Sequence, residues 1–503
     1  AVLRCNPDGS DLEVVAYGLR NPQELAFDQF GNLFTGDNNS DSGDRARWVY
    51  IVEGGDSGWR IGYQYGSDLH DSTVKQGNRG PWNYELLWKP ATENKAAYIL
   101  PPLRNFADGP SGFTHYPGVG LADKYKNHFF LADFRGNANG SGIWSFSTKP
   151  KGASFEMVDP QHFVWKILAT DCDFGPDSAF YISDWTEGWN PSARGRLYKV
   201  TDPEAQKNPA VLEAKQLLAE GVEKKSVAEL GKLLGHPHRQ VRLEAQLVLA
   251  AKEDKAATKT MQDIATSNTN LLARLHAVWA LGAAKFQRTE NATFLEQLLG
   301  DKELEIRVHA AKLLGDFAGS SPKALLPLLQ DKEPRVRLFA ALGLARQASA
   351  STDGTIRTAA FTLLRENNNS DPYLRHAGVM VLAKHAAPSD LAAATKEESV
   401  AVRLACVVAL RRQSSPQVTA FLQDSDANVV AEAARAINDD FSISAALPEL
   451  AKLTTKTDLA PVVLYRALNA NFLLGQAENA EALAKYAGRS DVPEATRLVA
   501  EEL

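Results

Sequence analysis

One loop near the start of the chain concentrates oxygen-bearing side chains far beyond the needs of a simple turn. Four Asp and three Asn fall within residues 28–44, directly after a strand-like run. Carboxylate, amide and main-chain oxygens are the ligands that Ca²⁺ prefers. The loop therefore predicts a cation site. Its expected ligands are Gly36, Asp37, Asn39, Asp41 and Asp44.

This loop is not an EF-hand. Asp37, Asn39 and Asp41 alternate as EF-hand ligands do, but Gly43 stands one position late and no Glu closes the site. The alternative is an Asx-rich turn network, in which the side chains accept hydrogen bonds from loop N–H groups. On the residues alone, both interpretations stay open.

Other Asp, Trp and His residues could have a functional role, but each also has a structural explanation. Three Asp near Trp185 could bind a cation or a sugar, or could only shape strand turns: Asp171, Asp173 and Asp184. Four Trp could form a sugar-stacking surface or fill the core: Trp59, Trp82, Trp88 and Trp189. We expect His236 and His238 to be surface residues. The chain has no GxSxG, HExxH, Walker or GxGxxG motif in a usable context.

The bulk composition is that of an ordinary globular protein. The 503 residues are 44% hydrophobic and 23% charged, which predicts at least two domains. A formal net charge of -6 argues against nucleic acid as a partner. No apolar run is long enough to span a bilayer. The three Cys are far apart and form no CxxC, so no haem attachment lies within this chain.

The first part, residues 1–203, has an all-β texture. It holds eight of the nine Trp and short apolar runs bounded by turn residues. The pattern of an apolar run, D-x-x-G, a second apolar run and Asp occurs as AFDQFGNLFTGD and again as DFGPDSAFYISD. Such recurrence favours the blades of a β-propeller over a sandwich, and about three blades are visible.

The second part, residues 204–503, has Ala, Leu, Lys and Glu at helical spacing. Six repeated arginines are separated by 32, 33, 30, 38 and 28 residues, the period of a helix-pair repeat. The pattern resembles HEAT repeats and predicts an α-solenoid. The repeated arginines are Arg242, Arg274, Arg307, Arg337, Arg375 and Arg403.

The residues of the repeat have physical roles. Asp301 or Asp331 can cap the following helix, and the arginine six residues later can reach a neighbouring loop carboxylate. We therefore predict a ladder of ion pairs along the stack. A functional alternative is a peptide-binding groove, with a protein partner on the concave face.

The first part resembles a known family. RNPQELAF at residues 20–27 and GGDSGW at residues 54–59 are similar to motifs of soluble pyrroloquinoline-quinone (PQQ) sugar dehydrogenases and aldose dehydrogenases. That family is a six-bladed propeller with the quinone over its axis and Ca²⁺ between cofactor and protein. The whole chain is similar to a group from planctomycetes and verrucomicrobia, in which such a propeller precedes HEAT repeats and a CxxCH haem domain.

The resemblance implies roles for individual residues. Arg20 would stack on or pair with the quinone, Asn21 and Gln23 would line its site, and Arg135 corresponds to a further cofactor-binding arginine. No residue matches the family's catalytic histidine, and His115 is our candidate. The family's Glu-His-Gly-Pro is replaced here by residues 35–38, TGDN, and half of the ring is expected to be missing.

Three functions follow. The first is an oxidoreductase that takes a hydride from a sugar or alcohol onto PQQ, assisted by Ca²⁺, and passes electrons to a cytochrome c. The second is a calcium-stabilised scaffold that binds protein or glycan, and the third is a Ca²⁺-dependent lactonase. Since the chain opens AVLRCNPDGS without initiator Met or leader, we expect a processed or truncated, periplasmic or secreted protein. It ends without a polar capping repeat, so we expect the native chain to continue.

Overall fold

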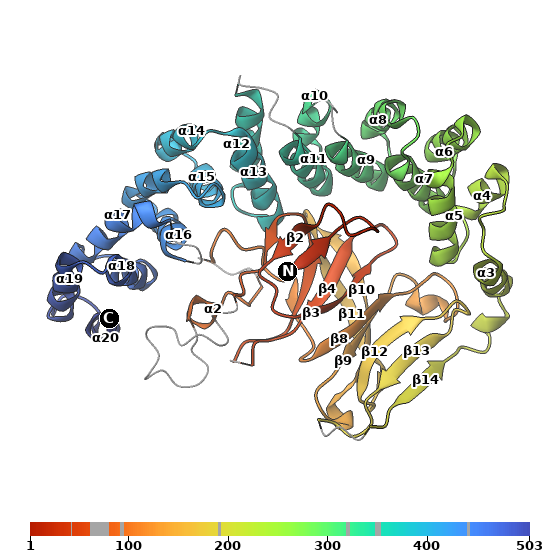
Figure 1. Ribbon diagram of the computed structural model, residues 1–503, viewed down its shortest axis with the longest axis horizontal. Coiled ribbons are helices and arrows are strands. Elements are labelled where there is room, and N and C mark those ends of the chain that lie inside the picture. The colour runs from red at the N-terminus through yellow and green to blue at the C-terminus, as the bar shows by residue number, and fades with distance from the viewer. Residues whose placement is uncertain are drawn as a thin grey trace. The chain divides into compact units, whose positions relative to one another are not determined.

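The computed structural model describes residues 1–41, 43–60, 80–90, 95–189, 193–317, 322–347, 354–439 and 443–503. Apart from α2 and short 3₁₀ helices, strands come first and helices follow (Figure 1). The last strand ends at Val200 and the first long helix begins at Pro209. No helix in these ranges is both long and apolar enough to cross a membrane.

The chain folds into two compact units, and each contains residues from the β part and from the helical part. The first consists of Ala1–Asn39, Arg45–Glu53 and Pro102–Gly343, and the second of Ser40–Asp44, Gly54–Pro101 and Leu344–Leu503.

The β part consists of four open sheets. Three of them have the strand orders β3-β4-β5-β7, β8-β9-β10-β11 and β12-β13-β14, and β1 pairs with β2 in the fourth. All the pairs in these three sheets are antiparallel. The strands are β1 (Val2–Arg4), β2 (Glu13–Tyr17), β3 (Pro22–Phe27), β4 (Leu33–Asp37), β5 (Arg47–Ile51), β6 (Gly55–Asp56), β7 (Arg104–Asn105), β8 (Pro110–His115), β9 (Phe129–Asp133), β10 (Gly142–Lys151), β11 (Ser154–Trp165), β12 (Ala169–Phe174), β13 (Phe180–Asp184) and β14 (Arg196–Val200).

Local sequence explains these strands. The alternation in β3 buries Ala26 and exposes the residues on either side, whereas β9 is buried along its whole length. The longest hairpin, β10–β11, closes with Lys151 opposite Ser154. Its two-residue turn begins with Gly152 at φ +58°, a conformation that favours glycine.

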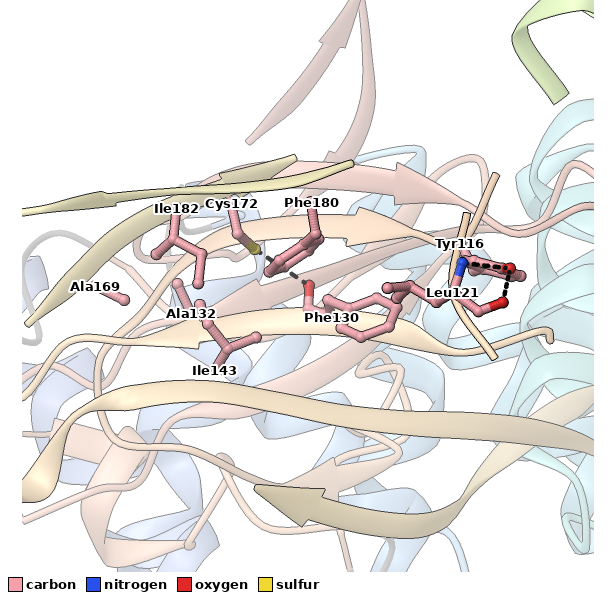
Figure 2. Packing of buried hydrophobic residues seen from close by; sticks show 9 residues of the cluster. All are labelled: Tyr116, Leu121, Phe130, Ala132, Ile143, Ala169, Cys172, Phe180 and Ile182. Carbon is pink, nitrogen blue, oxygen red and sulfur yellow. Dashed lines mark hydrogen bonds between the residues drawn. The ribbon is translucent and has the colours of Figure 1, made fainter. Parts of the chain in front are cut away.

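The first unit's β core lies between neighbouring sheets. Phe130 on β9 and Phe180 on β13 are fully buried and meet with their ring centroids 5.0 Å apart. Figure 2 shows this cluster, in which the Cys172 sulfur lies beside the carbonyl oxygen of Phe130. Its buried members are Tyr116, Leu121, Phe130, Ala132, Ile143, Ala169, Cys172, Phe180 and Ile182.

The helices follow one another as pairs. The predicted caps Asp301 and Asp331 accept from the N–H groups of Glu303 and Glu333, which lie just before α9 and α11, whereas other helix starts have a side-chain cap. The side chains of Asn270, Asp371 and Asp426 each accept a hydrogen bond from an N–H in the first turn of the helix that follows. The α-helices are α2 (Gly80–Tyr84), α3 (Pro209–Glu220), α4 (Val227–Leu233), α5 (Arg239–Ala251), α6 (Lys255–Ser267), α7 (Leu271–Ala283), α8 (Arg288–Gln297), α9 (Leu304–Asp316), α10 (Pro322–Leu325), α11 (Pro334–Arg346), α12 (Thr355–Asn367), α13 (Pro372–His385), α14 (Pro388–Ala393), α15 (Val400–Arg412), α16 (Ala427–Asn438), α17 (Leu447–Ala451), α18 (Pro461–Leu474), α19 (Ala477–Ala487) and α20 (Glu494–Glu502).

The expected fold is therefore found at the level of a β-sheet region followed by helix pairs. The propeller, and the division into residues 1–203 and 204–503, stay predictions.

Candidate functional site

The acid-rich loop begins at Asp37, the last residue of β4. The carboxylate of Asp37 is buried and accepts hydrogen bonds from the main-chain N–H groups of Asn21, at 2.8 Å, and Arg20, at 3.3 Å. It also forms an ion pair with Arg47 on β5, which is equally buried. This expected calcium ligand thus holds the start of β3 against β4 and β5.

Asp44, at the other end of the loop, has donors as partners too. Its carboxylate accepts from the N–H of Ser40 at 2.8 Å and from Nε1 of Trp82 at 2.7 Å. Asp41 has a φ of +58°, and Gly36 lies so close to Pro110 that a Cβ there would be 2.6 Å from the proline Cβ. This is the geometry of an Asx-rich turn network.

Among the described residues, no group of three or more His, Cys, Asp or Glu is arranged to hold a metal ion. Asn39, the remaining expected ligand, accompanies these residues in the loop, and Ser42 lies outside the described residues. Calcium binding stays a prediction.

The expected quinone residues are placed by the same loop. The main-chain N–H groups of Arg20 and Asn21 donate to the Asp37 carboxylate. Gln23 is exposed on β3. Arg135 follows β9 and donates to the Asp133 carboxylate at 3.0 and 2.7 Å. It also pairs with Asp108 at 2.7 Å. Hydrogen bonding to Asp133 raises the pKa of Arg135.

A cluster of carboxyl groups joins three sheets, and the sequence analysis missed its central member, Glu24. Burial raises the pKa of Glu24 to about 7, and the neighbouring Asp171 contributes in the same direction. The Glu24 carboxyl accepts a hydrogen bond from the N–H of Phe113 at 2.5 Å. Asp173 accepts one from the Thr114 hydroxyl at 2.8 Å. The signal available in the sequence was the pair of acids at alternate positions of a strand-like run, Asp171 and Asp173.

His115, the candidate catalytic residue, is buried at the end of β8. Burial, followed by the charge of Arg239, lowers its pKa to about 3, so the ring is neutral near pH 7. It lines a cavity of about 500 Å³ between the β part and the helices of the first unit. The cavity brings His115 together with Asp173 and His238.

The expectation that His236 and His238 are surface residues is wrong. They are only 6% and 3% exposed. His238 is the N-cap of α5, and its Nδ1 accepts from the N–H of Gln240 at 3.1 Å. His236 in turn accepts from the N–H of His238 at 3.0 Å. Both rings accept hydrogen bonds from main-chain N–H groups, and His238 caps α5. The sequence pattern GHPHRQ does not distinguish this role from surface exposure.

The predicted ladder of ion pairs is found in part: Arg274, Arg307 and Arg403 pair with loop carboxylates. Arg242 and Arg375 instead bond His276 and the carbonyl oxygen of Ala97. Arg307 pairs with Asp331 of the next loop at 3.1 Å and donates to the carbonyl oxygen of Asp301 at 2.7 Å. Arg403 pairs with Asp424 at 2.8 Å. Each such arginine ties its own loop to the loop of the following helix pair.

A second set of helix side chains binds the main chain of the β part. In the second unit, the two oxygens of Glu432 on α16 accept from the N–H groups of Ala97 and Tyr98 at 2.9 and 3.0 Å. Arg375 on α13 donates to the carbonyl oxygen of Ala97 at 3.2 Å, and Arg411 lies 4.0 Å from the centre of the Tyr98 ring.

The first unit uses the same chemistry on other helices. Arg239 on α5 donates to the carbonyl oxygen of Phe27 at 2.7 Å. Nε2 of His309 on α9 lies 2.6 Å from the carbonyl oxygen of Phe30. These contacts, which the sequence analysis did not predict, show helix side chains that bind main-chain groups of an extended or turning segment.

Comparisons with known proteins identify the helical part. Residues 291–383 match the family model of HEAT repeats, which confirms HEAT repeats in the C-terminal half of the chain. No curated protein matches the chain. The β-sheet region has no identified family.

Several solved structures are similar at low identity. An archaeal HEAT-like repeats protein from Thermococcus onnurineus NA1 is 16% identical over 50% of this chain and 97% of its own, with a TM-score of 0.28. Yeast importin-β (Kap95p) is 13% identical over 56% of this chain and 46% of its own, with a TM-score of 0.30. An engineered protein is 20% identical over 60% of this chain and 95% of its own, with a TM-score of 0.29.

Proposed function

We propose that the protein is an interaction scaffold whose HEAT repeats bind polypeptides. The observation that carries this proposal is the contact of Glu432 and Arg375 with residues 97–98. The carboxylate accepts hydrogen bonds from two successive N–H groups, and the arginine donates to the carbonyl oxygen between them. Both contacts involve the main chain, so they do not depend on a particular side chain. HEAT helices with this chemistry suit extended polypeptide segments.

The expected partner site on the concave face needs revision within this proposal. The second helices of several pairs already hold segments of the protein's own β part through their side chains. These side chains are Arg239, His309, Arg335, Arg375 and Glu432. We therefore assign the partner to the first helices of the pairs. On α6, for instance, Lys259 and Asp263 are 69% and 58% exposed.

Cross-linking mass spectrometry tests this assignment. The full chain would be cross-linked in an extract of the cells that make it, and each cross-linked protein would then be purified and titrated. Support is a purified partner whose binding weakens at least tenfold, about 1.4 kcal/mol, when the cross-linked lysine of a first helix is replaced by Glu. Lys149→Glu on β10, 63% exposed, is the matched control. Failure of every purified candidate to bind overturns the scaffold.

A quinone-dependent oxidoreductase is our second proposal. It is supported by Glu24, because a carboxyl with a pKa of about 7 suits a general base and stands next to Gln23 of the RNPQ motif. Sugar or alcohol would be the substrate and a cytochrome c the acceptor. When bound, PQQ would supply the hydride acceptor.

A PQQ titration followed by tryptophan fluorescence, with and without Ca²⁺, tests this second proposal. Saturable quenching that is lost in Arg20→Ala supports it. The absence of quenching overturns it. A lactonase would instead hydrolyse lactones with Ca²⁺ alone and ignore the quinone.

A further inference from the structure

Two buried histidines in the first unit accept hydrogen bonds from groups that can only donate. His276 on α7 accepts at Nε2 from Nε of Arg242, at 3.1 Å. Its Nδ1 lies 2.8 Å from Oε1 of Gln246. Because an arginine Nε–H cannot accept, Nε2 of His276 carries no proton, and the proton of the neutral ring lies on Nδ1.

His309 on α9 is fixed in the same way. Its Nδ1 accepts from Nε1 of Trp279 at 3.0 Å, and its Nε2 donates to the carbonyl oxygen of Phe30 at 2.6 Å. The indole of Trp279 stands edge-on to both imidazoles, with ring centroids 4.8 Å from His276 and 5.1 Å from His309. His309 thus bonds the turn after β3 directly, and Trp279 and His276 connect His309 to α7 and α5.

That turn is shaped to lie against these rings. The Asp28 carboxylate accepts from the N–H groups of Phe30 and Asn32, each at 2.9 Å. Gly31 has a φ of +74°, and a Cβ there would lie 3.0 Å from Trp279 and 3.3 Å from His309. The turn, residues 28–32, therefore rests directly on the two side chains.

The charged groups around the rings disfavour a second proton. Arg242 and Arg239 act on His276 from α5, and Lys312 and Arg335 act on His309 from α9 and α11. The nearby carboxylate of Glu305 pairs with Arg335. Burial is the larger cause, and together these effects lower the pKa of each imidazole to about 3.

We propose that His309 is an acid-sensitive latch that holds the turn 28–32 on α9, with Trp279 and His276 packed behind it. Protonation of His309 turns its accepting Nδ1 into a donor that faces another donor, Nε1 of Trp279. The bond is lost, and a cation is left in a buried site. The turn then separates from the helices in mild acid. Asp28 titrates in the opposite sense, since burial raises its pKa.

The sign and size of the effect follow from the two states. In the closed latch the imidazole pKa is about 3, whereas in the open latch it returns to the ordinary 6.5. The closed form is fully favoured above pH 6.5 and loses stability as the pH falls toward 3. At pH 5, His309 favours opening by roughly thirtyfold relative to pH 7.5, and Asp28 offsets part of this effect.

Hydrogen–deuterium exchange of the full chain tests the latch. Rates at pH 5.0 and 7.5 would be corrected for intrinsic exchange, in peptides that cover residues 27–34 and 304–316. We expect the corrected opening of these peptides to rise by up to about thirtyfold at pH 5.0, while peptides of α16 change less. Equal protection at both pH values overturns the proposal.

A variant separates the latch from general acid sensitivity. In His309→Gln, the amide oxygen can accept from Trp279 and the amide nitrogen can donate to Phe30, but the side chain does not titrate. We expect its pH dependence to fall by about thirtyfold, whereas His162→Gln, an exposed histidine on β11, keeps that of the wild type. Unchanged pH dependence in His309→Gln overturns the proposal. Should that variant not fold, His309→Asn, whose side chain does not titrate either, provides the same comparison.

Discussion

The carboxylate of Asp37 pairs with the guanidinium of Arg47 across adjacent strands, with both side chains at most 1% exposed. The same carboxylate binds the N–H groups of Arg20 and Asn21. A residue that looks like a cation ligand in the sequence therefore closes a hydrogen-bonded corner between β3, β4 and β5. Its negative charge is balanced by the protein itself.

Replacing Asp37 by Asn tests this relationship. The substitution leaves Arg47 buried without its counter-ion, so we expect a loss of about 3–5 kcal/mol in the free energy of unfolding. Urea unfolding in EDTA measures it. Glu13→Gln, which breaks the exposed pair with Arg4, should cost at most about 1 kcal/mol. A small loss for Asp37→Asn in EDTA, with wild-type stability that rises on adding Ca²⁺, would contradict this interpretation and favour a cation site.

The contact of Glu432 with Ala97 and Tyr98 gives a second prediction. In Glu432→Gln the side chain keeps one acceptor oxygen, and the other position becomes a donor that faces an N–H group. We expect a loss of about 1.5–3 kcal/mol, the size for hydrogen bonds to a charged group. Urea unfolding again measures it. Glu449→Gln, at an exposed pair with Lys452, should stay within about 0.5 kcal/mol of wild type. Equal effects of the two substitutions would show that the contact of Glu432 with Ala97 and Tyr98 contributes little to stability.

Periodicity was enough to predict the helical part. The repeat spacing and the pairing of Arg307 with Asp331 follow from local pattern, because each repeat contacts its neighbours in a similar way. The β part offered less, since strand runs predict strands but not which sheets meet. Its runs gave the strand positions and left the propeller unconfirmed.

The site was harder to predict because its partners are distant in sequence. Nothing near Glu24 in the chain shows that Asp171 will lie beside it, and nothing near Ala97 shows that Glu432 will bind its N–H group. The partner of Asp37 could not be predicted either, because a carboxylate can pair with an arginine as well as with a metal cation. Residue type limits the chemistry, and tertiary contacts choose among the possibilities.

Gly112 on β8 tests how closely the sheets must approach. A Cβ there would lie 2.5 Å from Cα of Asp171 and 2.5 Å from N of Cys172, both main-chain atoms of β12 that cannot rotate away. We therefore expect Gly112→Ala to cost about 1–3 kcal/mol through overpacking. Thermal unfolding compares it with Gly300→Ala, where a Cβ meets nothing within 4 Å. Equal stability of the two variants would mean that β8 and β12 separate without cost.

Glu24 gives a prediction about pH. Its pKa in the folded protein, about 7, lies above the ordinary 4.5, so the folded state holds a proton that the unfolded chain has released. The stability that this proton contributes is fully present below pH 4.5 and is lost as the pH rises through 7. In Glu24→Gln that loss disappears. We expect the variant to gain about 1–2 kcal/mol over wild type between pH 5 and pH 8, after allowance for partial solvent exposure. Urea unfolding at the two pH values measures the gain, with Glu156→Gln on β11, an exposed carboxylate paired with Lys149, as the control. A wild type that is no less stable at pH 8 than the variant would show that Glu24 ionises without cost, and it would remove the support that this carboxyl gives to a general base.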